Sequence, residues 1–195
     1  MKTQSILMSL FLASAIFADD GLLLKDDFTI AKLEGRRLSR GDWTIADGAA
    51  TCTQDDEIFK KYDDHGPIIR YDVLHTNSTV RFSFKPDGAK MFVFTANSEK
   101  EHVFRFIITS AGMSIRAFPP DNSGKSVALT LEKVLMKEGE WVTVEVKFEG
   151  SEVSVKIGDY PEKKYQDASF DRPKVNLTIG FSYGTLGVKD LLVRK

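Results

Sequence analysis

The sequence predicts an all-β protein, built as an antiparallel β-sandwich or jelly roll. Apolar and polar residues alternate without a break from Trp141 to Phe148, which is the period of a strand with one buried face. Similar segments recur about every 8–12 residues, and glycine, proline and aspartate stand between them. Residues 127–136 partly fit a helical spacing, but their apolar positions alternate equally well, and we expect a strand there.

Residues 65–110 predict four successive strands at the centre of the chain. The apolar positions of two of them alternate and are mostly aromatic: Val80, Phe82, Phe84, Phe104, Phe106 and Ile108. Residues 91–94 are apolar on both faces, so that strand should be covered on both sides. Pro86-Asp87-Gly88 supplies a turn between strands, because proline presets its own φ and glycine accepts a positive φ. Aromatic rows of this kind need a second sheet to cover them, so two packed sheets are expected.

Turn signals near both ends of the chain predict further hairpins. Asp47-Gly48 is a two-residue hairpin sequence, and Gly150-Ser151 follows the longest alternating strand. Apolar residues from Val175 to Tyr183 share one face, and residues 188–193 form the closing strand. Residues 54–67 are dense in charge and end in Gly-Pro, so we expect a long loop there and at most a single helical turn in the domain.

The composition excludes several classes of protein. The 195 residues are 42% hydrophobic and 28% charged, which suits one globular domain. The formal net charge of -1 gives no indication of nucleic-acid binding, which needs a more concentrated basic patch than Arg36, Arg37 and Arg40 provide. Cys52 is the sole cysteine, so an internal disulfide is excluded, and its alternating surroundings indicate a buried small side chain.

Residues 1–18 predict a signal peptide, and residues 19–195 are expected to form the single mature domain. Lys2 supplies a positive start, and an apolar run broken only by serine extends to Ala18, with cleavage after Ala18 or after Ala15. The run is too short to span a bilayer comfortably, and no later stretch approaches that length, so no stable membrane span is expected. The predicted location is secreted or periplasmic.

A tryptophan opens the strand in EGEWVTVEVKFEGSEVSVKIGDY, where a tight glycine turn leads into a second strand that ends in Gly-Asp. This segment resembles the penultimate hairpin of concanavalin A-like (laminin-G-like) jelly rolls, and GFSYGTLGVKDLLVRK resembles their terminal strand. The opening LKDDF, followed by GDWTIADGAA, resembles the start of the 3-keto-disaccharide hydrolase-like branch of that superfamily. The resemblance spans nearly the whole mature chain. It implies a jelly-roll fold and an exported protein that acts on modified sugars.

The chain lacks the catalytic motifs that would settle an enzymatic function. Laminarinase-type glucanases of the resembled superfamily carry Glu-x-Asp-x-x-Glu or Glu-x-Asp-x-Glu on one strand, which sets two carboxylates on one face. The nearest acidic cluster here is Asp55-Asp56-Glu57, whose adjacent residues would point to opposite faces, so a solvated loop is expected. Gly-x-Ser-x-Gly and His-Glu-x-x-His are both absent, and no metal site or cofactor is predicted.

The candidate site residues are polar side chains among the aromatic strands. His102, Arg105 and Arg116 lie on two strands that are expected to pair through a turn at residues 110–113. Because the alternating apolar residues need the core, both arginines should share the opposite face, present donors to hydroxyl or carboxylate groups, and have His102 near the rim. His102 and His65 are the candidate catalytic residues, since histidine can move a proton near neutral pH.

Asp64 and His75 complete the predicted ligand-binding set. Asp64 lies beside His65 in the charged loop before the first central strand, and His75 ends that strand. The pair Asp63-Asp64 supplies too few oxygens for a closed calcium site, so no metal is assigned to it. We therefore expect these residues to contact a ligand through hydrogen bonds alone.

The two arginines also have a simpler interpretation. Like charges directly opposite on neighbouring strands repel, so tolerance of both arginines indicates an anionic or hydroxyl-rich partner between them. An acidic side chain such as Glu101 or Asp121 would serve as well. In that case the arginines lie on a solvated face, and His102 is a loop residue.

Two functions follow, each with a carbohydrate as the partner. The first is an enzyme that cleaves 3-keto-glycosides, which only the branch resemblance implies. The second is a non-catalytic glycan-binding or structural module, which the missing carboxylate motif and the compact length favour. An enzyme should gather its histidines and arginines in one concave site, whereas a binding module should expose aromatic side chains on a shallow face. The sequence leaves the oligomeric state open.

Overall fold

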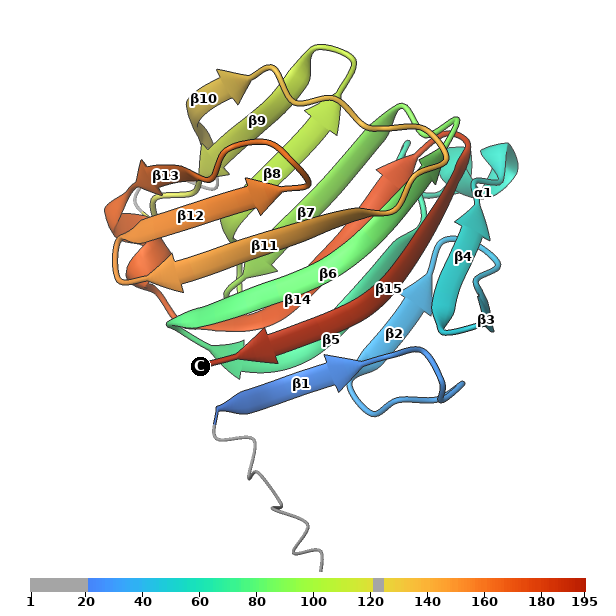
Figure 1. Ribbon diagram of the computed structural model, residues 1–195, viewed down its shortest axis with the longest axis horizontal. Coiled ribbons are helices and arrows are strands. Elements are labelled where there is room, and N and C mark those ends of the chain that lie inside the picture. Colours follow the sequence, from blue (N-terminus) through green and yellow to red (C-terminus); the bar gives the residue numbers. More distant parts are fainter. Residues whose placement is uncertain (1–20, 121–124) are drawn as a thin grey trace, which may run out of the picture.

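The computed structural model describes residues 21–120 and 125–195, which form two packed β-sheets (Figure 1). The predicted signal peptide, residues 1–18, lies outside the described residues. Within the described ranges, no helix has the length and hydropathy needed to cross a membrane. The prediction of an all-β, antiparallel sandwich is confirmed, because strands make up nearly all of the regular structure.

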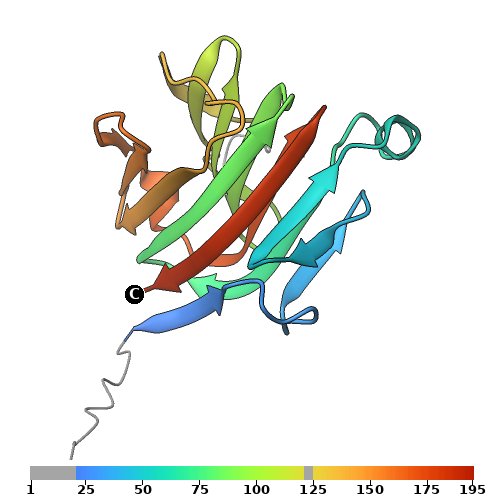
Figure 2. The same cartoon turned by 45° about the vertical axis from the view of Figure 1, so that its right-hand side comes forward.

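The first sheet has eight strands and contains both ends of the described domain. Its order is β13-β12-β11-β6-β15-β4-β3, with β1 paired to β15, and every pair is antiparallel. In Figure 2 the long green β6 and red β15 run side by side at its centre. The strands are β1 (Leu22–Asp26), β3 (Thr44–Ala46), β4 (Ala49–Thr53), β6 (Ser78–Asp87), β11 (Val142–Glu149), β12 (Glu152–Ile157), β13 (Lys163–Gln166) and β15 (Thr185–Arg194).

The second sheet has seven strands and contains most of the central stretch of the sequence. Its order is β10-β9-β8-β7-β14-β5-β2, again antiparallel throughout. The strand β14 comes late in the sequence but inserts between β7 and β5. The strands are β2 (Arg36–Ser39), β5 (Ile68–His75), β7 (Met91–Asn97), β8 (His102–Thr109), β9 (Gly112–Ala117), β10 (Val127–Glu132) and β14 (Lys174–Ser182).

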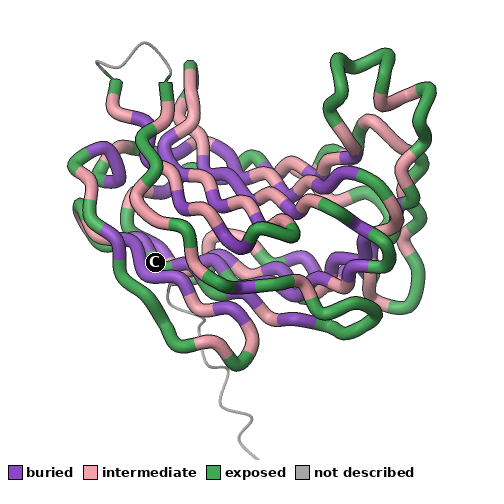
Figure 3. Tube along the Cα trace, turned by 90° about the horizontal axis from the view of Figure 1, so that it is seen from above, coloured by how far each residue is buried: buried purple, intermediate pink, exposed green. Residues whose placement is uncertain are grey.

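Aromatic side chains fill the space between the two sheets. Phe82 of β6 stacks on Phe94 of β7 with ring centroids 5.4 Å apart, and Phe84 stacks on Phe92 at 4.1 Å. All four rings are fully buried. Figure 3 shows buried residues along both layers and exposed residues in the loops around them. The alternation in sequence thus becomes a core, because every second residue of a strand faces the opposing sheet.

The predicted hairpin turns form where the sequence placed them. Asp47 and Gly48 join β3 to β4 with φ values of 51° and 72°. Two successive positive φ values are those of a tight hairpin turn whose twist matches the strands, which is why Asp-Gly is favoured there. Residues 150–151 likewise join β11 to β12. The strand expected within residues 127–136 is also present, as β10.

One prediction about helix content is wrong. The segment 54–67, expected to be a loop, contains α1 (Asp56–Lys61), and a short 3₁₀ turn, η1 (Ala168–Asp171), adds to it. The carboxylate of Asp55 accepts hydrogen bonds from the backbone amides of Glu57 and Ile58, both at 2.8 Å, and caps the helix. Acidic residues in the first turn and lysines in the last turn complement the helix dipole. No residue of α1 is buried, so the cluster is solvated as expected.

The sole cysteine lies in the core of the sandwich. Cys52 is buried on β4, which confirms its interpretation as a small apolar side chain. Burial, with a smaller contribution from the nearby charge of Asp42, raises the pKa of its thiol to about 11. A thiol in that state stays protonated at neutral pH, so it is a poor nucleophile and a packing residue.

Candidate functional site

The outer side of the seven-stranded sheet carries a continuous patch of polar side chains, which we name the arginine face. Four neighbouring strands, β14, β7, β8 and β9, contribute to it. These residues face outwards because their sequence neighbours, such as Phe94 and Phe106, are fully buried in the core. The members of the arginine face are Thr95, Asn97, His102, Arg105, Arg116, Asn176 and Thr178.

Arg105 and Arg116 are direct cross-strand partners on this face. They are paired in the β8–β9 ladder, whose turn occupies residues 110–111. His102 begins β8 and pairs with Asn97 of β7. The predicted geometry is therefore confirmed: the arginines share one side of one sheet, and the histidine lies at the edge of the same patch.

A chain of hydrogen bonds connects the arginine face from β8 to β14. Arg105 donates to Nε2 of His102, and the Nδ1 atom of His102 lies 2.5 Å from Oδ1 of Asn97. The amide nitrogen of Asn97 then donates to Oδ1 of Asn176 at 2.7 Å and to Oγ1 of Thr95 at 3.1 Å. This chain fixes the positions of side chains from three strands before any ligand binds.

The hydrogen bonds also fix the protonation state of His102. A guanidinium can only donate, so Nε2 of His102 must accept, and its single proton lies on Nδ1. Burial and then the charge of Arg105 lower the pKa of His102 to about 4, although Glu101 acts in the opposite direction. Both ring nitrogens are therefore occupied in a neutral ring. A proton-transfer role would require this chain of hydrogen bonds to break, whereas a role in positioning Arg105 needs no change.

The two arginines have hydrogen-bonding capacity that the described residues do not use. The Nε atoms of Arg105 and Arg116 are both buried and have no hydrogen-bond partner there. The guanidinium of Arg105 lies 5.3 Å from the ring centroid of Phe118, and Arg116 donates to Oγ of Ser126 at 2.7 Å. Burial and the charge of Arg116 lower the pKa of Arg105. An anionic or hydroxyl-rich ligand would have to bind at the exposed parts of the two side chains, where it would reduce the repulsion between the two cations.

The acidic partner that the sequence suggested for the arginines has another role. Glu101 forms an ion pair with Arg172 at 2.5 Å. Asp121, the other suggested partner, lies outside the described residues. Within residues 21–120 and 125–195, no carboxylate forms an ion pair with Arg105 or Arg116. The simpler interpretation, in which an acidic side chain pairs with the two arginines, therefore has no carboxylate to support it in this part of the chain.

A second pair of arginines in the same sheet provides a contrast. Arg37 of β2 and Arg70 of β5 are also direct cross-strand partners. Here Asp72 accepts from both of them, at 2.6 Å from Arg37 and 3.0 Å from Arg70. The carboxylate of Asp72 thus compensates part of the charge of this pair within the protein, which it does not do for Arg105 and Arg116.

The structure does not bring His65 and Asp64 into the arginine face. Both residues lie in the exposed loop after α1. The Nδ1 atom of His65 lies 3.0 Å from the carbonyl oxygen of Tyr62 and 2.8 Å from that of Asp63, so it ties the loop to the end of the helix. Asp64 has a φ of 58° in the same turn. Both residues thus have local roles in the turn, separate from the hydrogen-bonded network.

His75 is buried in the interior at the end of β5. Only 4% of its surface is exposed, and its Nδ1 atom lies 2.7 Å from Oγ of Ser78. Burial and then the charge of Lys174 lower the pKa of His75 to about 4. Lys174 is itself fully buried, and its ammonium donates to three backbone carbonyls, those of Thr76, Phe170 and Arg172. His75 therefore takes part in an internal polar cluster and not in a surface open to a ligand.

Sequence reasoning missed an aromatic side chain on the outer side of the eight-stranded sheet. Trp141 begins the alternating segment, in phase with the polar residues Thr143, Glu145 and Lys147. It is 38% exposed and borders a depression of about 530 Å³. The signal was present in the sequence, because a tryptophan in the outward phase of a strand cannot enter the core.

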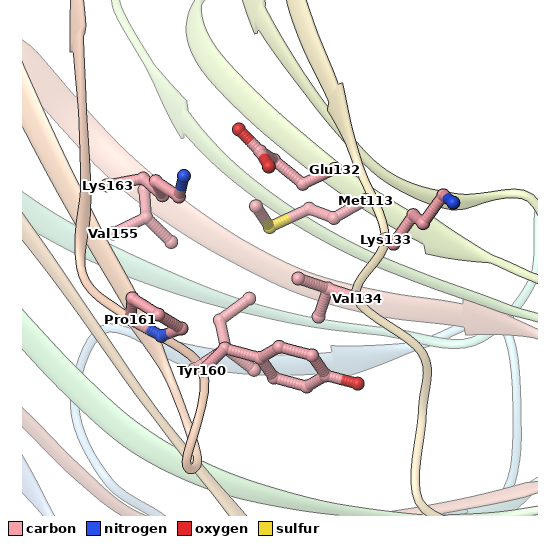
Figure 4. Close-up of a pocket in the computed structure, with 9 residues that line it drawn as sticks. Met113, Glu132, Lys133, Val134, Val155, Tyr160, Pro161 and Lys163 are labelled. Atoms are coloured by element: carbon pink, nitrogen blue, oxygen red, sulfur yellow. The ribbon is translucent and has the colours of Figure 1, made fainter.

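A smaller cleft opens at one edge of the sandwich, where β9 and β10 approach β12. Its volume is about 210 Å³. Figure 4 shows the apolar side chains of Met113, Val134, Val155 and Tyr160 around it. Glu132, Lys133 and Lys163 also line it, but its volume is below the range typical of ligand pockets, so we do not assign the ligand site to it.

The chain matches no family model, and it matches none of the curated proteins. Its fold, however, matches many solved structures. One is the carbohydrate binding module CBM66 from Bacillus subtilis, with a TM-score of 0.62, 11% identity, and coverage of 83% of this chain and 96% of that one. Another is LamAcat from Zobellia galactanivorans, with a TM-score of 0.61, 8% identity, and coverage of 90% and 98%.

A third similar structure is the galectin LEC-6 from Caenorhabditis elegans, with a TM-score of 0.53 and 13% identity. The match covers 65% of this chain and 89% of the galectin. At these identities the similarity establishes the fold alone, a jelly-roll β-sandwich. The resemblance to the 3-keto-disaccharide hydrolase-like branch stays a prediction.

Proposed function

We propose that this chain is an exported, non-catalytic glycan-binding module whose ligand binds on the arginine face. One observation carries the proposal: Arg105 and Arg116 are half-buried, are direct cross-strand partners, and form no ion pair with a carboxylate of the described residues. A guanidinium presents several donors in a rigid plane, which suits the hydroxyl pairs and carboxylates of sugars. The neighbouring network of His102, Asn97 and Asn176 holds this arrangement in advance of binding, which lowers the entropic cost of association.

The similar structures support glycan as the ligand class. One is named as a carbohydrate binding module and another as a galectin, and each resembles this chain over most of its own length. The arginine face consists of polar side chains, which can form hydrogen bonds with the hydroxyl groups of a glycan.

The geometry favours binding over glycoside hydrolysis. Hydrolysis by the common mechanisms needs two carboxyl groups about 5–10 Å apart on either side of the bond. Asp72 and Glu101, two carboxylates on the sheet and at its edge, are each held by arginine. His102 is neutral, and both of its ring nitrogens are occupied. Cleavage of 3-keto-glycosides therefore remains the second candidate, supported by the sequence resemblance alone.

Titration calorimetry on residues 19–195 with neutral and acidic oligosaccharides tests the proposal. We expect the double variant R105A/R116A to bind at least about tenfold more weakly, because hydrogen bonds from charged groups contribute about 1.5–3 kcal/mol each. Its melting temperature should not fall, since the substitution removes a like-charge pair. The matched control is R37A/R70A, a cross-strand arginine pair of the same sheet, which should bind normally. Equal losses in both variants, or a lower melting temperature in R105A/R116A, would show that the pair is structural.

Two further measurements test the remaining parts of the proposal. Incubation with 3-keto-glycosides and their unoxidised parents should release no sugar, and release that H102Q abolishes would establish the enzymatic alternative. Intact-mass analysis of protein recovered outside the inner membrane should give a chain that begins after Ala18. A mass that retains residues 1–18 in a membrane fraction would contradict export as a free protein.

A further inference from the structure

The outer side of the eight-stranded sheet carries a second polar surface, which we name the tryptophan face. Its depression of about 530 Å³ is bordered by side chains from β1, β6, β11 and β15. The depression is separate from the arginine face, because the two surfaces lie on opposite sides of the sandwich. Its principal members are Arg81, Lys85, Trp141, Gly187 and Lys189. The lining of the depression also includes three carboxylates, each in an ion pair: Asp26 with Arg36, Asp27 with Lys25, and Asp190 with Lys189.

Trp141 lies against the surface of the sheet. It immediately precedes β11 and reaches across β6 to β15, where Gly187 is its neighbour. A Cβ atom at position 187 would lie 3.0 Å from Cη2 of the indole, closer than normal packing allows. The absence of a side chain at Gly187 thus lets the ring approach the backbone while 38% of the tryptophan stays exposed. An aromatic ring supported in this way offers a flat apolar platform for the face of a pyranose.

Cationic side chains surround this platform. The Nζ atoms of Lys85 and Lys189 lie 5.3 and 4.8 Å from the ring centroid of Trp141. Lys189 also lies 3.7 Å from the carboxylate of Asp190. Lys85 and the exposed Arg81 form no ion pair with any carboxylate of the described ranges. Lys85 therefore lies beside the indole without an ion-pair partner in this part of the protein, whereas Arg81 lines the depression farther along β6, opposite Glu145 of β11.

A β-bulge shapes the surface beside Lys189. The pairing of β15 with β6 shifts by one residue between Lys189 and Leu192, and Asp190 has a φ of 55°. The extra residue lets Lys189 and Asp190 both face outwards, while Leu191 still enters the core. Such bulges re-aim side chains at binding surfaces, and here the bulge adds polar groups to the edge of the depression.

We propose that the tryptophan face is a second glycan site, which takes an acidic oligosaccharide. A pyranose ring stacks on Trp141 beside Lys85, and a carboxylate or sulfate on another residue of the same oligosaccharide meets Arg81, four residues along β6. The ligand class rests on the proposed function, but the site does not depend on the arginine face. Stacking supplies apolar contact, and the unpaired cations supply selectivity for a negatively charged sugar over a neutral one.

Tryptophan fluorescence tests the site directly, because the chain has only two tryptophans. In the W43F variant all tryptophan emission comes from Trp141. We expect trigalacturonic acid or a chondroitin sulfate tetrasaccharide to change this emission in a saturable manner. Maltotriose should bind at least tenfold more weakly, and sodium sulfate alone should give no saturable change. The variant R81Q/K85Q in the same background should lose at least tenfold in affinity for the acidic sugars, while K60Q/K61Q, a matched control of two exposed lysines in α1 outside the depression, should not.

The outcomes separate this site from the arginine face. Adding R105A/R116A to W43F should leave the emission titration unchanged. If neither acidic sugar changes the emission while calorimetry still shows binding that R105A/R116A abolishes, the second site is wrong and the proposed function stands. Equal responses to maltotriose and to trigalacturonic acid would also overturn the proposed charge selectivity. A Trp141 response without any effect of R105A/R116A in calorimetry would support the second site and contradict the arginine face.

Discussion

The two outer faces of the sandwich present cations in different ways. On the arginine face, Arg105 is half-buried and held by a neutral histidine, and the hydrogen bonds continue through Asn97 to Asn176. On the tryptophan face, the partly exposed Lys85 and Lys189 lie beside an indole. The first face offers directed donors in a fixed geometry, whereas the second offers an apolar platform with adaptable charges.

This difference teaches that one core can support two kinds of recognition. Each strand places alternate residues inside and outside, so each sheet has one face that the core does not constrain. The outer face of the seven-stranded sheet is suited to reading the hydroxyl and carboxylate geometry of a ligand. The outer face of the eight-stranded sheet is suited to attracting a charged sugar ring. A change in the core should therefore affect both faces, whereas a change on one face should leave the other intact.

Removing an aromatic side chain from the shared core should weaken both faces together. Phe94 is fully buried and packs against Phe82, Phe104 and Phe106. We expect Phe94→Ala to lower the free energy of unfolding by about 3–5 kcal/mol, because a cavity remains where the ring was. Urea denaturation measures this loss. A loss below about 1 kcal/mol would show that the two sheets do not depend on the aromatic core.

Acidification should lower the stability of the domain through two histidines, of which His102 lies on the arginine face and His75 in the interior. The pKa values of His75 and His102 are about 4 in the folded protein, against 6.5 for a histidine in an unfolded chain. The unfolded chain therefore binds more protons between pH 6.5 and 4, so stability is complete above pH 6.5 and falls as the pH drops towards 4. We expect a loss on the order of 2 kcal/mol over that window.

The variant H102Q separates the two histidines in this experiment. Glutamine can accept from Arg105 and donate to Asn97 but does not titrate in this range. The slope of unfolding free energy against pH should therefore be shallower for H102Q than for the parent protein, and the Trp141 emission of W43F should be unaffected by acid. Identical slopes for both proteins would refute the neutral, hydrogen-bonded state of His102.

Adding a side chain at position 187, beneath Trp141, should alter only the tryptophan face. In Gly187→Ala, the new Cβ would lie 3.0 Å from Cη2 of the indole, so the ring must tilt outwards. Because the ring is partly exposed and can move, we expect the free energy of unfolding to change by less than about 1 kcal/mol. The emission of Trp141 in the W43F background should shift to longer wavelength. An unchanged spectrum would show that the indole does not lie on Gly187.

The smallest effect on stability and binding is expected at the second arginine pair, Arg37 and Arg70. Asp72→Asn removes the carboxylate that Arg37 and Arg70 share at the surface. Exposed ion pairs contribute little, so stability should fall by about 0.5 kcal/mol. Ligand binding at the arginine face should change less than twofold by calorimetry. A large gain in affinity for acidic sugars would mean that any unpaired arginine pair in this sheet suffices, and that the buried network of His102 is unnecessary.

Local patterns predicted much of the candidate site. The alternation around Phe104 and Phe106 predicted that Arg105 points outwards, and the turn at residues 110–113 predicted its partner Arg116. The same reasoning could not place His75, which ends β5. Alternation predicts which side of a strand a residue faces, but not whether that end of the strand is buried in the domain or open to solvent. The N-cap Asp55 was a local helix signal within a charge-rich segment, where density of charge favoured a loop.

The sequence by itself determined the strand period, the hairpin turns and the side of each strand on which a residue lies. These features depend on neighbours in the chain, through backbone stereochemistry and the exclusion of apolar side chains from water. The tertiary structure alone decided that β14 inserts between β7 and β5, so that Asn176 meets Asn97, and that Trp141 reaches Gly187 across β6. The lateral order of strands depends on packing between residues far apart in the chain, and the alternation within each strand is compatible with many such orders.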